Sequence, residues 1–149
     1  MIDILVYLFE NYHDFSSHPK PEALARKLNA NGFEGGDISE ALDWLAGLKA
    51  ARAPEFASGN QTQRVYIGEE QQKLRAECLG FILFLETAGV VSPAIRELVI
   101  ERGMLLKDFP VPLAKFKVIV LMVLWSQNED LDSLIVEELL YEADTELMH

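Results

Sequence analysis

Cysteine is nearly absent from this chain of 149 residues, in which Cys78 is the single example. One cysteine cannot form an intramolecular disulfide or a thiolate metal cluster. Cys78 lies in an apolar run with no histidine near it in sequence. We therefore expect a small buried thiol of the core rather than a nucleophile.

Basic residues are also scarce, with 13 lysines and arginines against 24 acidic residues and a formal net charge of −11. The imbalance is largest at the end, because residues 129–149 hold eight acids and neither lysine nor arginine. Such a segment is repelled by phosphate backbones and by anionic membranes. The composition thus disfavours extensive electrostatic binding of nucleic acid.

Catalytic motifs are missing as well. The chain has no Gly-x-Ser-x-Gly elbow, no glycine-rich phosphate loop and no Cys–His pairing. Two Glu-x-x-His pairs, Glu10/His13 and Glu146/His149, have the spacing that di-iron bundles use. His13 follows a short helix and His149 is the last residue, so we expect no metal site, no cofactor and no enzyme activity.

Long hydrophobic runs are absent too. The most apolar segment, Phe116 to Trp125, has ten residues, whereas a membrane span needs about 20. The apolar N-terminal segment lacks the basic residues and the cleavage site of a secretory signal. We expect a cytoplasmic protein that makes no membrane contact.

Periodicity predicts three helices in residues 1–67. The first covers Ile2 to Tyr12, the second ends at Asn31-Gly32, and the third starts at Asp37 with Glu40 as its capping-box partner. A short extended segment, a polar loop and a β-rich strand, RVYI, follow and predict a small β-hairpin. This order favours a winged helix-turn-helix-like part, and a three-helix ubiquitin-associated-like fold competes with it.

Residues 68–149 are predicted to be helical and to share the core of the first part. The fold class is therefore mainly α, with a winged-helix-like N-terminal part and a helical C-terminal bundle. Ser92 and Pro93 are a cap and first-turn pair for one of these helices. The expected helices cover residues 68–89, 92–105, 115–127 and 131–143.

Two candidate sites follow from charged and aromatic residues. Trp44, Lys49, Arg52 and Arg64 surround the third helix and the expected wing, and are candidate contacts for nucleic acid or a partner protein. The exposed positions of that helix offer Glu40 and Asp43 rather than the Arg, Lys, Asn or Gln that contact base edges. A second group is expected to form a structural ion-pair cluster, namely Arg96, Glu97, Glu101 and Arg102.

Several motifs, in order from Ile2 to His149, resemble the bacterial Smg family: IDILVYLFENY, GF…DI..AL.WL, RELVIER, KFKVIVLMVLW and the closing MH. That family has no established biochemical function. Its genes often lie near those for a DNA-processing protein and a topoisomerase, so the resemblance implies a loose link to DNA metabolism. It supports a helical fold and an intracellular location.

Two function classes remain open. The first is a non-catalytic accessory protein that acts through protein contacts, because residues 79–91 and 116–125 are apolar on more faces than one neighbour covers. The alternative is a winged-helix regulator that binds DNA or RNA weakly. The partner and the oligomeric state do not follow from these patterns.

Overall fold

The computed structural model describes residues 1–12, 15, 19–51, 66–127 and 135–140, and all the regular structure in these ranges is helical. Residues 135–140 are helical and form the described part of the helix expected at 131–143. The labelled helices are α1 (Ile2–Asn11), α2 (Pro21–Ala30), α3 (Gly35–Ala50), α4 (Gly68–Thr87), α5 (Pro93–Met104) and α6 (Leu113–Ser126).

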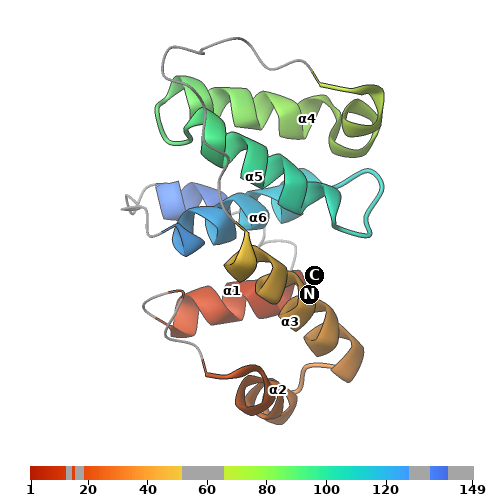
Figure 1. Ribbon diagram of the computed structural model, residues 1–149, viewed down its shortest axis with the longest axis vertical. Coiled ribbons are helices and arrows are strands. Elements are labelled where there is room, and N and C mark those ends of the chain that lie inside the picture. The colour runs from red at the N-terminus through yellow and green to blue at the C-terminus, as the bar shows by residue number, and fades with distance from the viewer. Residues whose placement is uncertain (13–14, 16–18, 52–65, 128–134, 141–149) are drawn as a thin grey trace.

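The helices are stacked along the long axis of the molecule (Figure 1). α4 lies at one end and α2 at the other, and α6 lies between α5 on one side and α1 and α3 on the other (Figure 1). The first three helices therefore reach the last ones mainly through α6, and the two halves of the chain share one core.

α6 is the centre of that core. Every residue from Phe116 to Trp125 is buried, including Lys117, whose Nζ donates to Glu138 at 3.2 Å. The other nine are apolar, and a helix that is apolar nearly all round is expected to be buried on all sides. Trp125 packs edge-on against Phe9 and Phe15, with ring centroids 5.4 and 5.3 Å away. The sequence expectation of a buried central helix is confirmed.

The turn between α2 and α3 is fixed by local rules. Gly32 has φ +93°, and the Phe33 N–H donates to Leu28 O at 3.2 Å, which is the six-residue closure that ends many helices. Phe33 then packs edge-on against Tyr7, with ring centroids 5.7 Å apart. The end of α2 at Asn31-Gly32 was predicted correctly.

The predicted winged helix with its β-hairpin is wrong, because the described residues form helices and no strand. Tyr66 and Ile67, which were expected in the second strand, lead into α4, where the Glu70 carboxylate accepts the Ile67 N–H at 3.0 Å. The remainder of the expected hairpin, residues 52–65, lies outside the described residues. A run of β-prone residues preceding a helix had been mistaken for a strand.

The start of α3 also differs from expectation. The helix begins at Gly35, two residues before Asp37, and its N-cap is Glu34 without a side-chain cap bond. Asp37 therefore lies in the first turn, where a carboxylate interacts favourably with the helix dipole. At α5, by contrast, the predicted cap is confirmed, since Ser92 Oγ accepts the Ile95 N–H at 3.2 Å.

α4 contains a break that no sequence pattern indicated. Arg75 has φ 58° and ψ 176° inside the helix, and such a break removes backbone partners from the preceding turn. The freed Lys73 carbonyl accepts the N–H of Val111 at 2.8 Å. In return, the Lys73 ammonium donates to the carbonyls of Met104 and Leu106 near the end of α5. These bonds join α4 to the α5–α6 connection.

Within the ranges described, every helix is too short or too polar to cross a lipid bilayer.

Candidate functional site

The most distinctive polar contact joins α3 to α5. The Trp44 Nε1–H donates to the Arg102 carbonyl at 3.3 Å, and Arg102 Nη2 donates to the Trp44 carbonyl at 3.2 Å. The guanidinium carbon also lies 5.0 Å from the centre of the Trp44 ring, a cation–π distance. Two residues 58 positions apart in the chain are thus held together by two reciprocal hydrogen bonds and one cation–π contact.

Gly47 makes room for this arrangement on the α3 side. A Cβ atom at Gly47 would lie 2.8 Å from Arg102 Nη1 and 2.9 Å from Nη2. Glycine inside a helix costs about 1 kcal/mol relative to alanine, so its presence here has a packing reason. The guanidinium rests directly on the backbone of α3.

Arg102 carries its charge into the interior without a counter-ion among the residues the structure describes. The residue is only 5% exposed, and its Nε–H is buried with no hydrogen-bond partner. Burial lowers the pKa of the guanidinium, and the charge of the nearby Glu101 carboxylate offsets only part of that effect. Of the five N–H donors of an arginine, one makes a hydrogen bond here.

A cleft of about 430 Å³ lies beside this contact. Its walls combine acidic residues of α3 with basic residues at the end of α5, and Trp44 and Leu105 add apolar surface. The lining residues are Met1, Gly36, Ser39, Glu40, Asp43, Trp44, Arg102, Leu105 and Lys107.

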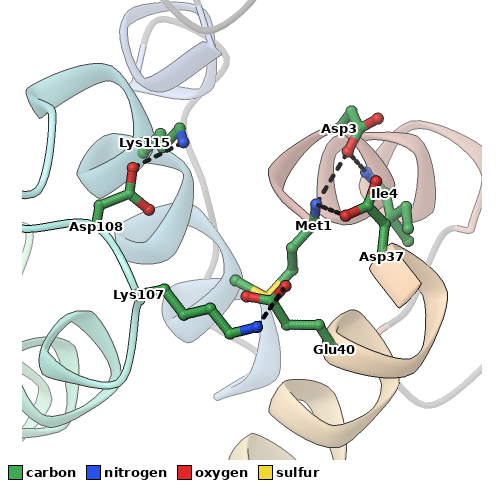
Figure 2. A network of polar contacts seen from close by, with 8 residues as sticks. All are labelled: Met1, Asp3, Ile4, Asp37, Glu40, Lys107, Asp108 and Lys115. Carbon is green, nitrogen blue, oxygen red and sulfur yellow. Dashed lines mark hydrogen bonds and ion pairs between the residues drawn. The ribbon is translucent and has the colours of Figure 1, made fainter. Parts of the chain in front are cut away.

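Polar contacts cross the rim of the cleft (Figure 2). Lys107 Nζ lies 3.8 Å from a Glu40 oxygen, and the Met1 amino group lies between the carboxylates of Asp3 and Asp37, at 3.3 and 3.9 Å (Figure 2). The Lys107 side chain is 83% exposed, so its pair with Glu40 is screened by solvent and weak.

Arg96, on the other side of α5, is fully paired. Its Nε donates to Glu97 at 2.9 Å and its Nη1 donates to Glu86 of α4 at 3.0 Å. Burial lowers the pKa of this guanidinium, but the bonds to Glu97 and Glu86 outweigh burial and the pKa is raised. The four residues expected in one ion-pair cluster are therefore divided, since Arg96 joins Glu97 while Arg102 joins Trp44 and exposed Glu101 lies between them.

The predicted surface contacts are placed differently from one another. Trp44 is buried, with 5% exposure, and Lys49 is exposed near the end of α3. Arg52 and Arg64 lie outside the described residues. Asp43 is exposed on α3, as expected, whereas Glu40 is half-buried.

The outer face of α4 carries exposed apolar side chains. Leu83 is 56% exposed and Phe84 63% exposed. Ala76, Gly80 and Thr87, which follow the same face at helical spacing, are also exposed and uncharged. α4 packs on α5 and α6 with its opposite face, where Cys78, Ile82 and Leu85 are buried.

Cys78 is buried as predicted, with no exposed surface. Its thiol lies 3.5 Å from the Val111 carbonyl. Burial raises the pKa of the thiol to about 12, and the Glu77 charge adds to that shift. A thiol with so high a pKa is a poor nucleophile at neutral pH.

The sequence pattern did not indicate the pairing of Trp44 with Arg102. Arg102 had been assigned to an ion-pair cluster of α5, and Trp44 to a candidate contact surface for nucleic acid or a partner protein. The one available signal was Gly47, a glycine inside an otherwise regular helix, which suggests close approach by another group.

The family described as "Protein of unknown function (DUF494)" matches residues 1–149. No solved structure matches.

Relatives named "Protein Smg homolog" cover nearly the whole chain. The protein of Aromatoleum aromaticum is 54% identical over 149 residues, covering 99% of this chain and 97% of the relative. That of Azoarcus sp. is 48% identical, with coverage of 98% and 96%. That of Bordetella pertussis is 46% identical over 152 residues and covers both chains completely. The chain therefore belongs to the Smg family, the family of DUF494 proteins.

Proposed function

We propose that this protein is a non-catalytic accessory protein of the cytoplasm that acts through contacts with another protein. The observation that carries the proposal is the outer face of α4, where Leu83 and Phe84 are each more than half exposed. Adjacent exposed apolar side chains on a helix face, here bordered by the exposed Glu77, are typical of protein interaction surfaces.

The surface of α3 supports protein rather than nucleic acid as the partner. Its exposed or half-buried polar side chains include Glu40 and Asp43, which repel phosphate, and Lys49 is the basic residue of its last turn. With a net charge of −11, a basic or neutral protein surface is the better electrostatic match.

The test uses a single charge placed on the α4 face. Phe84→Glu introduces a carboxylate in the centre of the proposed interface, and Ala46→Glu introduces the same charge on an exposed position of α3 as a matched control. Tagged chains would be used for affinity capture from cell extract, with quantitative mass spectrometry of the captured proteins.

We expect a reproducible set of partners with the unaltered chain and with Ala46→Glu, and loss of that set with Phe84→Glu. An identical set with all three chains, or no set at all, contradicts the proposal. Fluorescence anisotropy with DNA and RNA runs in parallel. Binding that falls steeply with salt and ignores Phe84→Glu would favour the nucleic-acid alternative.

A further inference from the structure

We propose that the cleft between α3 and the end of α5 binds a small zwitterion, a molecule with a carboxylate at one point and an ammonium at another, as in a free amino acid. This site is separate from the α4 face and does not depend on the proposed protein contact. The Arg102 guanidinium lies buried in the wall of this cleft, with an Nε–H that has no hydrogen-bond partner and no counter-ion among the described residues.

The basic wall of the cleft suits a carboxylate. Arg102 lines the cleft, and one of its N–H groups is bonded to protein, to the Trp44 carbonyl. A buried cation attracts an incoming anion more strongly than an exposed cation does, because the protein interior screens the attraction less than water. Lys107, on the same side and largely exposed, adds a second positive charge.

The acidic wall disfavours a plain anion and favours an ammonium. Glu40 and Asp43 lie on α3, opposite the basic wall, and both line the cleft. They repel phosphate or a simple carboxylate, whereas a ligand ammonium gains from them. The weak Glu40–Lys107 contact at 3.8 Å shows that the two walls face each other across the rim, and a zwitterion would replace that contact with two shorter ones.

The size and the apolar part of the lining match the same class. A volume of about 430 Å³ lies in the lower half of the range for small-molecule pockets, roughly 300–1,000 Å³. The Trp44 ring and Leu105 provide apolar surface for a side chain. A small amino acid with an apolar side chain matches all three parts of the lining: its carboxylate the basic wall, its ammonium the acidic wall and its side chain the apolar surface.

The chain contains its own reporter for the test. Trp44 and Trp125 are its two tryptophans, so Trp125→Phe leaves Trp44, in the wall of the cleft, as the single indole. Three probes separate the charges: leucine carries both, 4-methylpentanoate carries the carboxylate alone, and 3-methylbutylamine carries the ammonium alone. Isothermal titration calorimetry on the unaltered chain repeats the measurement without any substitution.

We expect leucine to change the Trp44 emission saturably and to bind at least about tenfold more tightly than either single-charge probe, since each charged contact contributes about that factor. Arg102→Met and Glu40→Gln should each weaken leucine about tenfold as well. Lys115→Gln is the control, because it removes the ion pair with Asp108, a carboxylate about as exposed as that of Glu40. This substitution should leave leucine binding unchanged.

Three results would overturn the zwitterion site. One is the absence of saturation by leucine or any other amino acid below about 10 mM, the range of very weak binding. The second is equal binding of leucine and 4-methylpentanoate. The third is binding that survives both Arg102→Met and Glu40→Gln. The capture experiment on Phe84→Glu is unaffected by any of these results, so the two proposals fail separately.

Discussion

Two arginines of α5 have the same burial and opposite surroundings. Arg96 and Arg102 are 7% and 5% exposed and lie six residues apart, a spacing that turns a helix by roughly 600° and directs them to different sides. Arg96 bonds two carboxylates, Glu86 and Glu97, whereas Arg102 stacks on Trp44 and bonds its carbonyl. Burial lowers both pKa values, yet the pKa of Arg96 is raised overall and that of Arg102 is lowered.

The bonded partners of a buried arginine, and not its burial alone, therefore determine the direction of its pKa shift and whether its charge is neutralised. At the α4–α5 contact the charge is neutralised, so Arg96 joins two helices. At the α3–α5 contact the charge is uncompensated, and the cleft next to it can take a ligand.

Arg96→Met should reduce the free energy of unfolding by about 3 kcal/mol, the lower end of the range for breaking a buried ion pair. The substitution leaves Glu86 and Glu97 close together without their cation, although each side chain is 24% exposed and can recover some water. Urea denaturation followed by circular dichroism measures the change. Lys115→Met, which removes a more exposed pair, should cost less than about 1 kcal/mol, and an equal cost for both would contradict the contrast.

Gly47→Ala should cost about 1 kcal/mol net, because the new Cβ would lie 2.8 Å from Arg102 Nη1 and overpacking typically costs 1–3 kcal/mol, while alanine regains about 1 kcal/mol of helix propensity. Thermal and urea unfolding measure the loss. The loss should largely disappear in an Arg102→Met background, so a double-mutant cycle tests whether the guanidinium is the obstacle. Gly80→Ala is the control, since nothing lies within 4 Å of its Cβ position; it should stabilise α4 by about 0.5–1 kcal/mol.

Cys78 is a buried titratable group that, unlike the two arginines, is neutral at pH 7. The folded pKa is raised from 9.0 to about 12, so between these values the unfolded chain releases the thiol proton and the folded chain keeps it. Stability therefore falls as pH rises from 9 towards 12. Between pH 8 and pH 10 the unaltered chain should lose about 1 kcal/mol more than Cys78→Ala. The free energy of unfolding would be measured by urea denaturation at each pH. If it changed equally with pH in the two chains, the thiol would titrate normally and the prediction would be wrong.

Arg102→Met should have the smallest effect, within about 1 kcal/mol of the unaltered chain. A buried charge without a counter-ion contributes little net stability, and an apolar side chain of similar length restores the packing. The Trp44 carbonyl loses one donor, which limits any gain. Urea denaturation measures the change, and a loss as large as that of Arg96→Met would mean that Arg102 is a structural group of equal weight.

Local patterns predicted much of the helical architecture. The end of α2 at Gly32 and the Ser92 cap of α5 follow from nearest-neighbour chemistry, and the burial of α6 follows from its mostly apolar composition. The β-hairpin was wrong because strand propensity depends on a partner strand, which a sequence window does not contain. The start of α3 was misplaced because aspartate is favoured both as an N-cap residue and in the first helical turn, so Asp37 fits either position.

The set of helices, the central place of α6 and the membership of the Smg family follow from composition, periodicity and the order of motifs. Which buried arginine has a counter-ion depends instead on how the helices pack. The break of α4 at Arg75, where Val111 takes up the freed carbonyl of Lys73, depends on that packing as well. The physical reason is distance along the chain: Trp44 meets Arg102 across 58 residues, and such a contact exists only after the helices have packed.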